Sequence, residues 1–140
     1  MTGRVVLSAV FVALAFAAWP LLGRESRVSG AWMASVVMGG SAVLIVMLSA
    51  SQLAIGMPTG RAWWLLGAAA IANGVAVYVY ASQAANPTVP AASFIVLVSV
   101  LQVTAIPLLA WALPGGLAPT MRQAAGFVCA AAAVYLLAKG

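Results

Sequence analysis

Uncharged polar side chains lie in the middle of three long apolar segments of this chain. Ser41, Asn73 and Gln102 stand near the centres of the second, third and fourth apolar stretches. A polar group in lipid that lacks a hydrogen-bond partner costs several kcal/mol, so such groups are expected to face the interior of a helix bundle. The chemistry that these residues offer is therefore hydrogen bonding, either between helices or to a bound solute.

Two interpretations of these residues compete. Asn, Gln and Ser in membrane helices often join neighbouring helices, each contributing about 1 kcal/mol or less. Their common depth favours a polar cavity instead, because transporters bind substrate near the bilayer midplane. Helical spacing adds Tyr80, seven residues after Asn73, and Ser99, three residues before Gln102. The candidate substrate-binding residues are Trp19 (at one mouth of the pathway), Ser41, Asn73, Tyr80, Ser99 and Gln102.

No Asp, Glu, Lys, Arg or His lies in the part of the apolar segments that is expected to stand within the hydrocarbon core. The chain has no histidine, its single cysteine is Cys129, and Glu25 lies in a short polar loop between Arg24 and Arg27. A proton relay normally uses intramembrane Asp, Glu or His. The sequence has no nucleophile beside a base, no metal-ligand set and no phosphate-binding loop. We therefore expect no enzyme activity, no catalytic residues, no metal and no cofactor.

The composition predicts an integral membrane protein. Of 140 residues, 66% are hydrophobic and 5% are charged, whereas soluble domains carry about 25% charged residues. The net charge of +5 comes from basic residues scattered singly between apolar runs. They are expected to set membrane topology rather than to bind nucleic acid.

Five hydrophobic spans are predicted, all helical because the hydrocarbon core leaves backbone groups no other partner. They run over about residues 5–22, 31–52, 62–84, 91–113 and 121–138, near the roughly 20 residues that a crossing needs. The first span resembles a signal peptide, but it continues through Trp19 and Pro20 to spanning length, which favours a retained helix. The predicted fold is all-α, a single domain of five transmembrane helices over residues 1–140.

Small residues and one proline predict how these helices pack. Gly67, Gly74 and Ala81 follow one stripe of the third span, and Gly39 with Gly40 lies beside Ser41. Small residues at such spacing let membrane helices approach closely. Pro107, inside the fourth span, removes one backbone hydrogen bond and is expected to kink that helix.

The basic residues do not fix an orientation in the membrane. With five crossings, Arg4, Arg61 and Arg122 lie on one side, and the other side carries Arg24, Arg27 and Lys139. The positive-inside rule needs an imbalance. Either other features decide the orientation, or the chain inserts both ways and pairs with an inverted copy, the arrangement that many transporters build by internal duplication.

The third to fifth spans resemble one EamA-like domain of the drug/metabolite transporter superfamily. The likeness rests on GAAAIANGVAVYVYASQA, PAASFIVLVSVLQVTAIPLLAWAL and MRQAAGFVCAAAAVYLLAKG, with Gln123, Gly126 and Val134 to Leu137 in the last. The segment ALAFAAWPLLG is similar to the first helix of such domains, where a Trp recurs. The likeness covers nearly the whole chain, through motifs of mostly small and apolar residues.

The chain also departs from this family. Where the family often has a Gly-Glu pair between the last two helices, PGGLAPT carries no acid. The related small multidrug resistance proteins have four helices and a functional glutamate in the first, so their proton-coupled cation export does not carry over. Family members usually contain two five-helix halves in opposite orientations. The resemblance therefore implies that one half needs a partner, either an inverted copy of itself or a paralogous chain.

Together these features predict a small multi-pass transporter subunit of the inner (cytoplasmic) membrane. It would move a small neutral or weakly polar solute by alternating access, as an antiparallel homodimer or a paralogous heterodimer. Two alternatives stay open: a subunit of a lipid-linked substrate flippase, for which an apolar groove suits a lipid tail, and a non-transporting membrane subunit that stabilises another protein.

Overall fold

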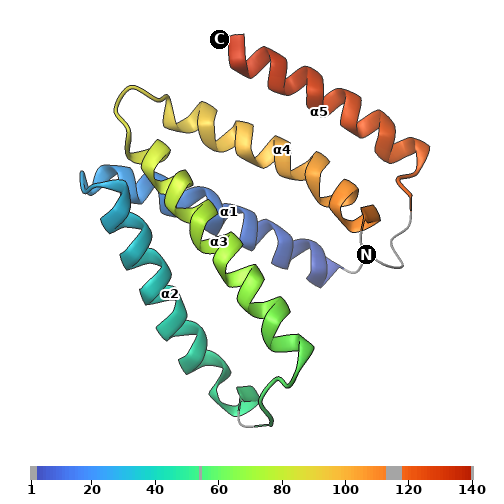
Figure 1. The fold of residues 1–140 in the computed structure, drawn as a ribbon. Helices are drawn as coiled ribbons and strands as arrows, with labels where there is room; N and C mark the ends of the chain where they lie inside the picture. Colours follow the sequence, from blue (N-terminus) through green and yellow to red (C-terminus); the bar gives the residue numbers. More distant parts are fainter. Residues whose placement is uncertain (1–2, 54, 113–117, 140) are drawn as a thin grey trace. The chain divides into compact units, whose positions relative to one another are not determined.

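The computed structural model is all-α and describes residues 3–53, 55–112 and 118–139. Its five helices are α1 (Gly3–Glu25), α2 (Gly30–Leu53), α3 (Arg61–Ala85), α4 (Ala91–Ala112) and α5 (Met121–Lys139) (Figure 1). No strand occurs in these ranges. The predicted all-α class and the five helices are confirmed, with bounds within three residues of those expected; the expected end of the fourth span, residue 113, lies outside the described ranges.

Helices α1 to α4 are long and apolar enough to cross a membrane. The apolar stretch of α5, Met121–Leu136, is shorter than those of the other four helices. The chain thus has the character of a multi-pass membrane protein. The fifth crossing stays a prediction.

The chain divides into two compact units, Met1–Val89 and Pro90–Gly140, here called the N-terminal and C-terminal units. In the N-terminal unit α3 packs against both α1 and α2, and in the C-terminal unit α4 packs against α5. The sequence predicted one domain over residues 1–140, and that assignment stays a prediction.

Side-chain caps mark where two of the helices begin. At α5, the backbone N–H of Thr120 donates to Gln123 Oε1 at 2.7 Å, and the Gln123 N–H donates to Thr120 Oγ1 at 3.3 Å. This reciprocal pair is a capping box, which satisfies two N–H groups that the helix itself cannot use. Ser29 accepts from the Trp32 N–H before α2. The chain after α3 is held by Asn86, whose Oδ1 accepts from the N–H and the hydroxyl of Thr88.

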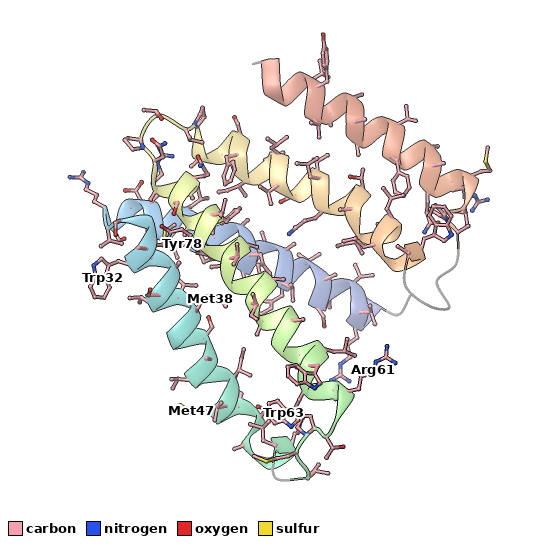
Figure 2. The ribbon with its side chains drawn as sticks, viewed as in Figure 1. Trp32, Met38, Met47, Arg61, Trp63 and Tyr78 are labelled. Carbon is pink, nitrogen blue, oxygen red and sulfur yellow. The ribbon has the colours of Figure 1, made fainter. Side chains whose placement is uncertain are left out.

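The buried residues of the N-terminal unit lie at one end of it. Here α1 runs into α2 and α3 ends, and Figure 1 shows the three helices meeting. We call this the joined end; its buried residues are Pro20, Met33, Ala34, Ala81 and Ala84. The opposite end, where α3 begins, we call the open end. Figure 2 shows Tyr78 toward the joined end of α3 and Arg61 and Trp63 at its open end.

Gly30 lies at a point of close approach between α2 and α3. A Cβ atom built on Gly30 would meet the Ser82 backbone, with its nitrogen only 2.7 Å away. By contrast, a Cβ at Gly39, Gly40, Gly67 or Gly74 would meet nothing within 4 Å. The close packing predicted at those four glycines is therefore wrong within the described part of the N-terminal unit, and of the predicted stripe only Ala81 is buried there. The tight contact sits about two to four turns away from them, because the helices approach at the joined end.

This contrast gives a test with a matched control. Gly30→Ala should destabilise the folded protein by about 1–3 kcal/mol, because a methyl group there overlaps the α3 backbone. Gly39→Ala on the same helix should leave stability unchanged or raise it, because Ala is the better helix former. Unfolding in mixed detergent followed by circular dichroism measures both. Equal effects of the two substitutions would contradict the helix register described above.

Candidate functional site

Trp19 and Tyr80 are the two predicted site residues whose side chains meet. Their ring centroids are 5.3 Å apart at an interplanar angle of 46°, a tilted aromatic pair that joins α1 to α3. Trp19 also packs against the buried cluster of Met33, Ala34, Ala81 and Ala84. Trp19 therefore lies within the packing of the joined end.

Ser41 continues the packed face of α2 toward the middle of the helix. Ala34 is buried and Val37 half-buried, and Ser41 follows them by seven and four residues, so all three share one face. Ser41 itself is exposed. It therefore lies just beyond the point where α2 leaves the buried cluster.

Asn73 holds the same position on α3. It precedes the half-buried Val77 by four residues and Tyr80 by seven, which places all three on one face. Asn73 is exposed, like Ser41. Along both helices the polar residue comes next after the last packed one.

The register of α2 and α3 puts Ser41 and Asn73 at one level. Gly30 lies against Ser82, and the two helices run in opposite directions. From that contact Ser41 is about 16 Å along α2 and Asn73 about 14 Å along α3, at about 1.5 Å per residue. Each residue is also near the midpoint of its helix, Gly30–Leu53 or Arg61–Ala85. Both side chains therefore lie at about mid-depth of a helix of spanning length.

Neither side chain has a hydrogen-bond partner among residues 3–53, 55–112 and 118–139. By comparison, Ser49 on α2 donates to Ile45 O at 2.6 Å, and Ser82 on α3 donates to Tyr78 O at 2.8 Å. Hydroxyls of membrane helices commonly satisfy themselves in this way. The hydrogen-bonding capacity of Ser41 and Asn73 is thus available to a ligand, to water or to another helix.

The α1 side of this level is apolar. Trp19 meets Tyr80, and α1 and α3 run in the same direction. Seven residues back from that pair, Val12 on α1 stands at the level of Asn73. At this level α2 thus carries a hydroxyl, α3 an amide and α1 an aliphatic side chain.

Ser99 and Gln102 belong to the C-terminal unit, on α4. The Ser99 hydroxyl donates to Ile95 O at 2.9 Å. Gln102 is exposed and, within the described part of the chain, makes no side-chain hydrogen bond. Like Ser41 and Asn73, it stands at the middle of its helix, Ala91–Ala112. Its membership of the same site stays a prediction.

Arg24 has a structural role that the sequence reasoning did not assign to it. Its Nη1 donates to Val89 O at 2.7 Å and to Ala84 O at 3.4 Å, so the end of α1 is tied to the end of α3. A cation at a helix C-terminus is favourable because the last carbonyls carry partial negative charge. The partners are 60 and 65 residues away, and nothing in the local sequence distinguishes this arginine from Arg27.

Comparisons with protein-family models, with curated proteins and with solved structures find no match for this chain. The resemblance to an EamA-like domain therefore rests on the residues given above.

The aromatic pair can be tested by a double-mutant cycle. Trp19→Leu and Tyr80→Leu should show a coupling of about 0.5–1.5 kcal/mol in the free energy of unfolding, because each removes the other's ring partner. Trp64→Leu serves as the control, since Trp64 is 82% exposed at the open end of α3. Its effect should add to that of Tyr80→Leu. Additivity of the Trp19 and Tyr80 substitutions would show that the pair does not hold α1 to α3.

Proposed function

We propose that this protein is a membrane transporter subunit that binds a small neutral or weakly polar solute between the middles of its helices. The observation that carries the proposal is the placement of Ser41 and Asn73, which lie at one level on the packed faces of α2 and α3 with no partner in the described residues. In the hydrocarbon core such groups need a hydrogen-bonding neighbour. In a transporter, a solute bound in a hydrated chamber provides that hydrogen-bonding neighbour.

The character of the solute follows from the side chains around that level. Ser41 and Asn73 offer hydrogen-bond donors and acceptors without charge, and Val12 offers aliphatic surface. None of the apolar spans contains Asp, Glu, Lys, Arg or His near its middle. A solute with a full charge would lack a counter-ion there, which favours an uncharged one. Gln102 of α4 is proposed as a further wall of this chamber.

The partner in this proposal is a second copy in the inverted orientation, or a paralogous chain. Arg4 and Arg61 lie at the N-terminal ends of α1 and α3, and Arg24 and Arg27 at or after the C-terminal end of α1. Over the chain, three basic residues stand against three if all five helices cross. With that balance, the same polypeptide can insert in either orientation. The EamA-like resemblance supports pairing with an inverted partner. The inner membrane is the proposed location.

Solute flux tests the binding residues. In proteoliposomes holding the purified protein, we expect flux of at least one member of a panel of radiolabelled sugars, polyols and nucleosides. Asn73→Leu and Ser41→Ala should each lower flux at limiting solute by about three- to tenfold, as the loss of one hydrogen bond predicts; Gln102→Leu should act likewise. Ser49→Ala is the matched control, because the Ser49 hydroxyl is already satisfied by Ile45 O.

Two results would count against this function. Folded Asn73→Leu and Gln102→Leu variants that transport like the parent would remove these residues from the pathway. No flux for any solute, with either a tightly copurified lipid or a stoichiometric larger protein, would favour the flippase or the accessory subunit.

Terminal reporters test the partner. Enzymes active only in the cytoplasm or only in the periplasm, fused in turn to each terminus, should both give signal at both termini if the chain inserts in two orientations. Adding two lysines after Met1 should then bias the mixture toward one orientation, because the balance of three against three is broken. A single orientation in the parent would remove the self-inverted dimer and leave the paralogous partner.

A further inference from the structure

Exposure rises along a single line of α3 from the joined end to the open end. Ala84, Val77 and Ala70 are seven residues apart and therefore share one face. Ala84 has 0% exposure, Val77 is half-buried against the buried cluster, and Ala70 is exposed. Asn73 lies between the last two. Within this unit, helix packing thus blocks access to Ser41 and Asn73 from the joined end, where Ala84 lies. It does not block access from the open end, on the side of Ala70.

The closure consists of four contacts that all lie at the joined end. Gly30 meets the Ser82 backbone, Met33 packs onto Gly23, Trp19 stacks on Tyr80, and Arg24 donates to Ala84 O and Val89 O. The first three are van der Waals contacts between apolar or neutral groups. Lipid tails are as apolar as these groups, so in a bilayer such packing has no hydrophobic driving force and stabilises the joined end through close fit alone.

Arg24 differs from the other three because its contact is charged and directional. A hydrogen bond from an ionised donor is roughly twice as strong as a neutral one. Its acceptor Ala84 O belongs to the last turn of α3, where the helix dipole adds to the attraction. Since Arg24 is on α1 and both acceptors belong to α3 and the residues after it, parting the joined end requires these bonds to break.

We propose that Arg24 fastens a gate at the joined end, so that the level of Ser41 and Asn73 is reached from the open end and is shut off from the other side until the Arg24 bonds release. This inference rests on the proposed function for the meaning of the site, but the gate itself is a property of α1 and α3. Arg24 is a positioning residue here: it acts on the site through the backbone of α3 and does not touch the solute.

Thiol accessibility tests the gate without any transport. In a Cys129→Ala background, single cysteines are placed at Ala70 and at Val77, and the protein in lipid nanodiscs is treated with a charged, membrane-impermeant maleimide. Nanodiscs expose both faces, so the orientation of the chain does not affect the result. The Ala70→Cys thiol should react at least about tenfold faster than the Val77→Cys thiol, because Val77 is on the closed side.

Substitution of Arg24 should then change only one of the two rates. Arg24→Ala should raise the Val77→Cys rate about tenfold and leave the rate of the already exposed Ala70→Cys thiol within about twofold, while circular dichroism reports that the protein is folded. Arg24→Lys should restore the protection of Val77→Cys, because it keeps a cationic donor near the same carbonyls. A general loosening of the fold would instead lower the helical signal in circular dichroism, and Arg24→Lys would not restore the protection of Val77→Cys.

Two results would overturn the gate: equal reactivity of the two cysteines in the parent, or a Val77→Cys rate that Arg24→Ala does not change. The comparison of the two cysteines in the parent needs no Arg24 variant, so it still tests the gate if Arg24→Ala fails to fold. The failure of the proposed function looks different. If the two cysteines differ as expected and Arg24→Ala raises only the Val77→Cys rate, but no solute of the panel is transported, the gate stands and the proposed function falls.

Discussion

The register of α2 against α3 rests on the absence of a side chain at Gly30. Because Gly30 has no Cβ, the Ser82 backbone can lie directly against α2. That contact, together with Met33 and Ala34 packed against Ala81 and Ala84, sets which residues of the two helices stand at the same level. Ser41 and Asn73 come to one depth because of it, since they lie at similar distances along their helices from the point of contact. A shift of one residue on α3 would turn Asn73 about 100° away from the shared face.

The same end of the molecule explains why one arginine differs from the others. Arg4, Arg61 and Arg122 all stand in the first turn of a helix, where a positive charge opposes the helix dipole. Their positions do not favour helix stability, so membrane topology is the better account of them. Arg24 stands at the end of α1 and bonds the carbonyls at the end of α3. There both the helix dipole and the tertiary hydrogen bonds favour the positive charge of Arg24.

Much of this arrangement could be predicted from the sequence, and the limits have physical causes. The helices and their bounds follow from apolar runs broken by Gly, Pro and charge, because lipid leaves the backbone few alternatives. The shared face of Asn73 and Tyr80 follows from helical periodicity. The packing of the glycines does not: the sequence favoured Gly39 and Gly67, inside the predicted spans, whereas the glycine in contact is Gly30, just before the second span, and only the crossing of the helices decides this. The bonds from Arg24 join residues 60 and 65 positions apart, for which a single sequence gives no signal.

The position of the contacts, rather than their number, connects the fold to the proposed function. A three-helix unit packed evenly along its length would bury Ser41 and Asn73 against their neighbours, and each would serve only to join helices. Here the packing stops one turn before these residues on both α2 and α3, so their hydrogen-bonding groups are presented at mid-depth and left unused by the unit. Confining the strong contacts to one end also leaves the helices free to separate or approach at the other end. The proposed site would then stand between one closed end and one open end, as the proposed alternating access requires, because opening one side must be separable from opening the other.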